Sequence, residues 1–163
     1  MIIFAVDFYT FPMSLQEQIN NAIKVAMKEK DTVALQSLRA VKSAILLAQT
    51  ETGAKADLTD EQELKLLQKL VKQRKDSAAI YMEQGRQDLA SPEIAEAEVI
   101  EQFLPQQLSE EEIAKEVDAI IKKTGASSMK DMGQVMGMAS KELAGKADGK
   151  TISTIVKSRL SGE

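Results

Sequence analysis

Short polar sequences that open helices recur along the chain, and each is followed by apolar residues spaced three and four apart. The pairs Ser14–Glu17, Thr59–Gln62 and Ser109–Glu112 place Ser or Thr three residues before Glu or Gln. This is the capping box that satisfies free N–H groups in the first helical turn. Spacings of three and four gather apolar side chains on one helical face, whereas strands alternate. The sequence therefore predicts an all-α protein.

Seven helical segments are predicted, and Pro105 separates the first four from the last three. In the fourth, Ser91 is predicted as the cap and Pro92 as the first helical residue. We expect an N-terminal helical domain of about four helices over 13–105 and a three-helix tail domain over 106–163. The first four segments span about 15–29, 32–51, 60–84 and 92–104, and the second of them is predicted to stop near Gly53. The last three run from Ser109 to Gly125, from Ser128 to Gly145 and over about 150–160.

The first twelve residues differ from all that follow. They hold four of the six aromatic residues, with β-branched neighbours and no basic n-region of a secretory signal. The capping box at Ser14 makes Met13 a natural start. We expect residues 1–12 to be a leader or a segment introduced in cloning. The alternative is a genuine arm that docks as a strand on this chain or a neighbour.

The chain has no histidine and no cysteine, which removes whole classes of chemistry. Histidine-dependent triads, thiolate nucleophiles, disulfides and His- or Cys-ligated metals are excluded. The acids at 110–112 lie in a first helical turn, where the helix dipole favours them. No apolar run approaches the roughly 20 residues that span a bilayer. We therefore expect no catalytic residue, cofactor, metal or membrane partner.

Charge is distributed unevenly along the chain. Between Asp88 and Asp118 there are ten acids and one lysine, a stretch that would repel a phosphate backbone. Residues 124–163 carry six basic and four acidic residues. Two basic surfaces are candidates for binding nucleic acid: Lys65, Lys69, Lys72, Arg74 and Lys75 in the third helix, and Lys141, Lys146, Lys150, Lys157 and Arg159 in the tail.

The segment from Gly145 to Thr151 superficially resembles a phosphate-binding loop. It has three residues between its glycines where the loop needs four, and it follows a helix rather than a strand. A tight turn between helices fits better, with Gly145 as a C-cap and Asp148 as an N-cap. A further possibility is that free N–H groups and the two lysines at this turn hold one backbone phosphate.

Gly133 and Gly137 lie four apart, among methionines, on one face of the sixth helix. Each glycine costs a helix ~1 kcal/mol relative to alanine, so a close approach of another backbone is the usual reason for the pair. That backbone belongs either to a neighbouring helix of the fold or to a docked partner or nucleic acid. The neighbouring helix is the usual cause in a soluble protein and is what we expect, and the docked partner or nucleic acid is the alternative.

Five segments in order make residues 13–163 resemble the YqeY-like proteins of the GatB/YqeY superfamily. The resemblance implies that the tail is similar to the C-terminal domain of the B subunit of glutamine-dependent aspartyl/glutamyl-tRNA amidotransferase. There the domain is a tRNA-binding appendage, and the catalytic centres lie in other domains and subunits. The matching segments are residues 38–44, 72–81, 101–105, 132–137 and 145–149 followed by Val156-Lys157.

The resemblance implies a non-catalytic, cytoplasmic protein that binds tRNA or a component of the amidotransferase. One alternative is a protein-interaction adaptor without RNA binding, which uses the acidic surface of the fourth and fifth helices. Another is an amidotransferase in its own right. The positions expected to face RNA are Gly133, Gly137, Lys141, Lys146, Asp148, Gly149, Lys150 and Lys157.

Overall fold

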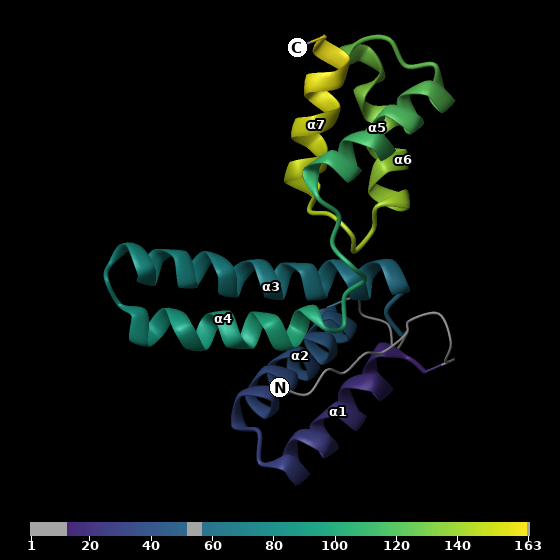
Figure 1. Ribbon diagram of the computed structural model, residues 1–163. Helices are drawn as coiled ribbons and strands as arrows, with labels where there is room; N and C mark the ends of the chain where they lie inside the picture. The colour runs from purple at the N-terminus through teal and green to yellow at the C-terminus, as the bar shows by residue number, and fades with distance from the viewer. Residues whose placement is uncertain (1–12, 52–56, 163) are drawn as a thin grey trace. The chain divides into compact units, whose positions relative to one another are not determined.

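A computed structural model describes residues 13–51 and 57–162, which contain seven α-helices, one short 3-10 helix and no strand (Figure 1). The all-α prediction is confirmed. The chain divides into two compact units, which we call unit 1, up to Pro105, and unit 2, from Gln106 onward. The predictions made for residues 1–12 and for a stop near Gly53 lie outside the described residues.

Unit 1 holds α1 (Leu15–Glu29), α2 (Thr32–Glu51), α3 (Asp60–Glu83) and α4 (Gln87–Glu101). Helix α1 packs on α2, α2 packs on α3 and α4, and α3 and α4 lie side by side as a long hairpin (Figure 1). The core is aliphatic apart from one aromatic ring. Its fully buried larger side chains are Ile19, Leu38, Val41, Ile45, Leu67, Ile100 and Phe103.

Local hydrogen bonds fix the starts of the first three helices where the sequence predicts them. The hydroxyl of Ser14 accepts the N–H of Glu17 at 3.2 Å, and the Glu17 carboxylate accepts the N–H of Ser14 at 3.0 Å. Thr59 and Gln62 repeat the arrangement at the start of α3. Asp31 accepts the N–H of Ala34 at 2.9 Å at the start of α2. The capping boxes predicted at Ser14 and Thr59 are confirmed.

Helix α4 begins five residues earlier than predicted, at Gln87, and Pro92 lies inside it. Ser91 is not a cap, because its hydroxyl donates to the carbonyl of Gln87 at 3.0 Å. Gly85 reverses the chain with φ of +69°, and Ala90 is then buried where α4 packs along α3. Tertiary packing thus outweighs the loss of the backbone N–H at Pro92.

Unit 2 holds α5 (Glu110–Thr124), η1 (Met129–Asp131), α6 (Met132–Glu142) and α7 (Gly149–Ser161). Each of the three α-helices packs on the other two around an apolar core. The predicted capping box at Ser109 and the glycine stop at Gly125 are confirmed. The sixth segment differs from the prediction, because it opens with the 3-10 turn and its helix ends at Glu142, before Gly145.

Candidate nucleic-acid interface

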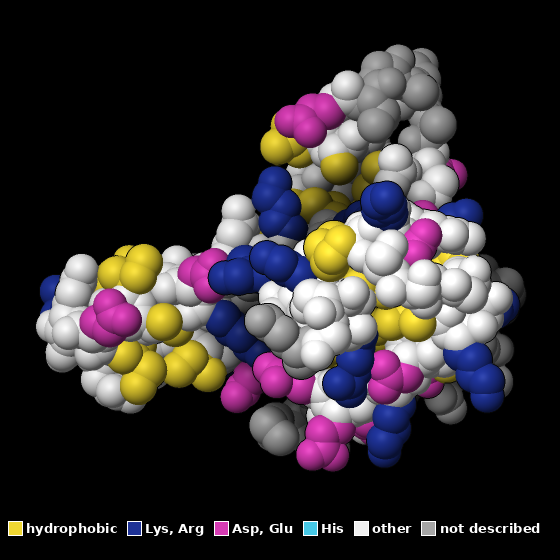
Figure 2. All heavy atoms as spheres, turned by 90° about the horizontal axis from the view of Figure 1, so that it is seen from above, with side chains coloured by type: hydrophobic (Ala, Val, Ile, Leu, Met, Phe, Trp, Pro, Cys, Tyr) yellow, Lys and Arg dark blue, Asp and Glu magenta, His cyan; other side chains and the backbone are white. Residues whose placement is uncertain are grey.

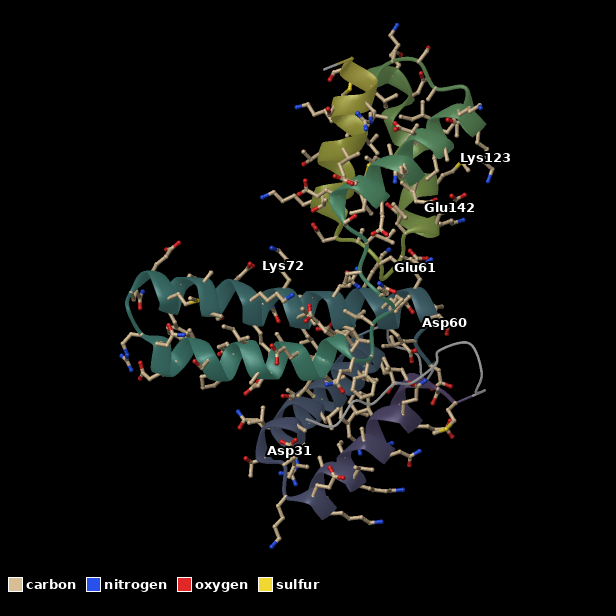
Figure 3. All side chains as sticks on the ribbon, viewed as in Figure 1. Asp31, Asp60, Glu61, Lys72, Lys123 and Glu142 are labelled. Atoms are coloured by element: carbon tan, nitrogen blue, oxygen red, sulfur yellow. The ribbon has the colours of Figure 1, made fainter. Side chains whose placement is uncertain are left out.

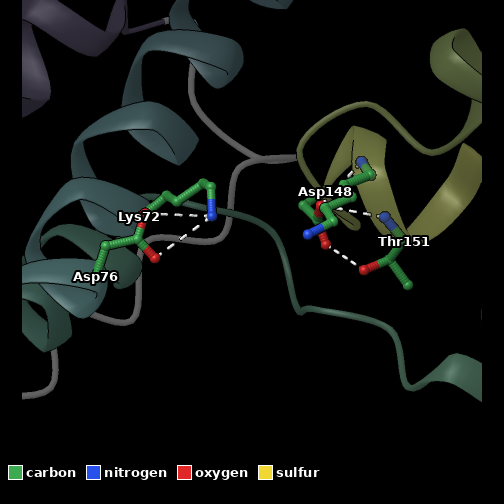
Figure 4. Close-up of polar contacts among 5 residues, drawn as sticks. Lys72, Asp76, Asp148 and Thr151 are labelled. Carbon is green, nitrogen blue, oxygen red and sulfur yellow. Dashed lines mark hydrogen bonds and ion pairs between the residues drawn. The ribbon is translucent and has the colours of Figure 1, made fainter. Parts of the chain in front are cut away.

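The turn between α6 and α7 is organised by Asp148. One carboxylate oxygen of Asp148 accepts the N–H of Lys150 at 2.9 Å and that of Thr151 at 3.2 Å. The other accepts the Thr151 hydroxyl, as Figure 4 shows. Asp148 is therefore the N-cap of α7, as predicted. Gly145 follows the helix end by three residues, with φ of +74°, while Leu143 occupies the C-cap position.

This cap changes what the turn can bind. The N–H groups of Lys150 and Thr151 already bond to a carboxylate, so they are not available to a phosphate in this conformation. The charge of Asp148 also opposes an anion there. Lysine side chains remain as the donors for a phosphate at this turn. The exposed Gly149 adds no side chain, and a Cβ there would meet nothing within 4 Å.

The turn is tied to the segment that leads into unit 2. The N–H of Leu108 donates to the carbonyl of Lys146 at 2.9 Å, and the Gln107 side chain donates to the carbonyl of Gly145 at 2.6 Å. Lys146 itself is half-buried, whereas Lys150 is exposed. Two hydrogen bonds from residues 107 and 108 thus hold the backbone at 145–146, and they fix the position of the Lys146 Cα.

A bare strip of backbone follows one face of α6. Gly133, Gly137 and Lys141 are spaced by four residues, so they share that face, and all three are exposed. A Cβ built on either glycine would meet no atom of residues 13–51 or 57–162 within 4 Å. The explanation that these glycines allow close helix packing within the fold is therefore wrong. The second explanation, an approach from outside the chain, stays a prediction.

Four lysines of α6, α7 and the turn between them form no ion pair with any residue that the structure describes. We call Lys141, Lys146, Lys150 and Lys157 the tail lysines. Lys150 and Lys157 are seven residues apart and so share a face of α7. The neighbouring acid Glu142 is bound by Lys123 of α5 at 3.3 Å (Figure 3), which leaves Lys141 unopposed.

Two other cations of unit 2 depart from the sequence expectation. Arg159, counted with the tail surface, pairs with Asp118 of α5 at 2.9 Å. Lys130, which is not among the residues predicted to face RNA, is exposed in η1 and forms no ion pair within the described part of the chain. Its position three residues before Gly133 was the available signal. Nearby, the N–H groups of Ser127 and Ser128 lower the pKa of Asp131.

The basic row on α3 is mostly neutralised. Lys65 pairs with Glu61 at 2.6 Å, and Lys72 pairs with Asp76 at 3.3 Å (Figure 4). The other pairs reach α4: Arg74 binds Glu96 at 2.8 Å, and Lys75 binds Glu101. Lys69 alone in this row has no ion pair among the described residues. The two candidate basic surfaces therefore differ in the charge that they leave available.

One carboxyl group has a strongly raised pKa, and it lies outside this interface. Burial, followed by the nearby charges of Asp60 and Asp57, raises the pKa of Glu63 from 4.5 to about 7. Over residues 13–51 and 57–162, no three His, Cys, Asp or Glu side chains converge as a metal site would require. Over the same residues, no helix has the length and apolar character to cross a membrane.

Comparison with known families matches residues 16–160 to the family described as Yqey-like protein. The chain belongs to this family. The match spans both units and leaves out the first residues, as the resemblance in the sequence does. It covers every residue of the candidate interface.

Three curated relatives extend this comparison. The E subunit of glutamyl-tRNA(Gln) amidotransferase from Thermococcus gammatolerans is 37% identical over 73 residues, which cover 42% of this chain and 12% of the relative. Altered inheritance of mitochondria protein 41 of Meyerozyma guilliermondii is 40% identical over 85 residues, 50% of this chain and 42% of the relative. Its Saccharomyces cerevisiae namesake is 29% identical over 90% of this chain and 75% of its own length.

Proposed function

We propose that this YqeY-family chain binds tRNA through unit 2, as a non-catalytic accessory to glutamine-dependent tRNA amidotransferase. The observations that carry the proposal are the bare glycine strip of α6 and the tail lysines of the same unit, which have no ion pair among the described residues. Gly137 costs α6 ~1 kcal/mol relative to alanine, and no described neighbour makes use of the missing side chain. Docking of an outside backbone would offset that cost. The similarity to a component of a tRNA amidotransferase supports tRNA as the ligand.

The composition of unit 2 favours contact with the sugar-phosphate backbone. Residues 106–163 contain no aromatic side chain, so unit 2 offers no platform on which unpaired bases could stack. Recognition would then depend on RNA shape and on phosphates that contact Lys141, Lys150 and Lys157. Asp148 acts in this proposal as a positioning residue, because it sets the direction in which α7 begins.

The compartment that we propose is the cytoplasm, where the chain would meet its tRNA. The yeast relatives carry mitochondrial names, which makes a mitochondrial location the alternative. Fluorescent tagging of the chain in its own cells distinguishes the two.

The experiment is a tRNA gel shift with the full chain at about 50 and 200 mM salt. Each lost phosphate contact lowers the slope of log K against log salt by ~0.7–0.9. Lys146→Glu with Lys150→Glu should therefore weaken binding at least ~10-fold at low salt and lower that slope by about 1.5. Lys65→Glu with Lys72→Glu makes the same charge change on α3 and should alter affinity less than ~3-fold.

Because Lys146 is half-buried, its substitution could disturb the fold, so a second variant with only exposed changes is needed. Lys141→Glu with Lys157→Glu changes two exposed residues and should weaken binding to a similar extent, with an unchanged circular dichroism spectrum. Salt-independent binding, or equal losses in the α3 control, would contradict the proposal. A protein partner retained after nuclease treatment, without tRNA binding, would support the adaptor alternative. Ammonia release from glutamine by the purified chain would overturn the non-catalytic part.

A further inference from the structure

The closed end of the α3–α4 hairpin lies beyond the core of unit 1. The core takes Leu67 and Val71 from α3 and Ala97 and Ile100 from α4, and it includes nothing from the residues between them in the hairpin. We call residues 78–94 the hairpin tip. Within it Ala78 and Ala90 are buried, and α3 and α4 pack along one another. Within the described part of unit 1, the tip is thus a two-helix structure that adds no residue to the core.

Large apolar side chains are exposed on this tip. Ile80 is 53% exposed and Met82 52%, and Leu89 and Ile94 follow at 36% and 38%. In Figure 2 the end of the hairpin, at the left, carries several hydrophobic side chains on its visible face. Met82 and Ile94 each lie four residues after a buried alanine of their helix, so both flank the α3–α4 contact, whereas Ile80, two residues before Met82, lies on the opposite side of α3. Scattered exposed apolar residues are ordinary, but a pair that flanks the contact of two helices is the pattern of an interaction surface.

The charge around these side chains is negative and lacks a free cation. Glu83, Glu93 and Glu98 form no ion pair with any described residue. The only cation in residues 76–98 is Arg86, and both its Nε and one terminal nitrogen bind the Asp88 carboxylate at 2.9 and 2.8 Å. That contact lowers the pKa of Asp88, so the carboxylate stays charged. Apolar and acidic groups therefore alternate around the tip.

We propose that the hairpin tip binds a basic amphipathic helix of a partner protein. The apolar face of such a helix would cover Met82 and Ile94 as a third helix, and its lysines or arginines would meet the carboxylates that have no ion pair among the described residues. Ile94 and Glu98, four residues apart on α4, present both features on one face. RNA and anionic membranes would be repelled by this charge. A second copy of the tip would bring like charges together.

The test uses the full chain and a fluorescein-labelled 18-residue helical peptide with leucines on one face and lysines on the other. Fluorescence anisotropy should show binding that weakens at least ~10-fold for Met82→Ser with Ile94→Ser and much less for Ile80→Ser with Leu89→Ser, because Ile80 lies on the other side of α3. Leu46→Ser with Leu47→Ser, exposed on α2, is the matched control and should change affinity less than ~2-fold. A peptide with glutamate in place of lysine should bind at least ~10-fold more weakly.

Three outcomes would overturn the proposal. The first is equal binding of the lysine and glutamate peptides, and the second is full binding by the variant Met82→Ser with Ile94→Ser. The third is a dimer in sedimentation that the tip substitutions dissolve, since the occupant would then be a second copy. The proposal does not depend on tRNA binding. Lys141→Glu with Lys157→Glu should leave peptide affinity unchanged, and the tip variants should keep their tRNA affinity.

Discussion

The α3 basic row and the tail lysines are built from the same residue types but differ in their electrostatic state. On α3, Lys65, Lys72 and Lys75 each have a carboxylate partner, and Arg74 is bound to Glu96 with side chains only 16% and 14% exposed. In unit 2, Lys141, Lys150 and Lys157 are exposed without an ion pair in the described structure. The first row forms ion pairs within unit 1, whereas the second leaves its charge unmatched in the described structure.

Because of this difference, the number of lysines in a segment does not by itself show where an anion binds. A lysine whose charge is matched at 3 Å presents little field to a distant phosphate, because the two charges largely cancel. Five cations in eleven residues made α3 the denser basic segment in sequence. In the structure, however, more of the positive charge of the tail lysines than of the α3 row is left without an ion pair. The predictions that follow test whether pairing is the property that separates the two surfaces.

The largest effect is expected at Arg74. Arg74→Ala leaves the carboxylate of Glu96 half-buried and without its cation, which should destabilise the chain by about 2 kcal/mol. Lys72→Ala breaks an exposed pair on the same helix and should cost no more than ~0.5 kcal/mol. Urea unfolding measures both. Equal, small losses would show that the α3 row has no structural role, and the comparison would fail.

The next effect is expected at Gly137, in the middle of α6. Gly137→Ala should stabilise unit 2 by about 1 kcal/mol, because the new methyl group meets no neighbour and the helix gains propensity. The same change should weaken tRNA binding, since it covers bare backbone. Thermal unfolding and the gel shift provide the two measurements, with Ser140→Ala on the same helix as control. If Gly137→Ala stabilised unit 2 and left tRNA binding unchanged, the glycine strip would not be part of the tRNA-binding surface.

A smaller effect should follow when the α3 lysines lose their partners. Glu61→Gln with Asp76→Asn removes the negative charges beside Lys65 and Lys72 and keeps side-chain size. If ion pairing is what prevents the α3 lysines from contacting tRNA, tRNA affinity should rise about 3-fold at low salt, and the gain should vanish at high salt. The variant Glu110→Gln with Glu111→Gln alters the same total charge elsewhere. An equal gain there would indicate a net-charge effect only.

The smallest effect concerns Glu63, which shares α3 with the basic row. Its folded-state pKa of about 7 lies above the ordinary 4.5, so folding favours the protonated carboxyl. That contribution to stability is complete below pH 4.5 and is lost as pH rises through 7. Glu63→Gln should therefore raise the melting temperature at pH 8 more than at pH 5. An equal shift at both pH values would mean that Glu63 titrates normally.

Most of the secondary structure was predictable because its signals are local. The caps at Ser14, Thr59 and Ser109 depend on hydrogen bonds between residues three apart, and such bonds form wherever the helix forms. The start of α4 was not predictable in the same way. Its position depends on the burial of Ala90 along α3, a contact that no window of adjacent sequence contains.

The candidate site shows the same division. Sequence by itself determined that the chain is helical, that it lacks the side chains for His- or Cys-based chemistry, and that Asp148 caps α7. Only the tertiary structure decided that Gly133 and Gly137 face no described neighbour and that two α3 cations, Arg74 and Lys75, are matched by α4 carboxylates. The physical reason is that caps depend on neighbours in the chain, whereas exposure and ion pairing depend on neighbours in space.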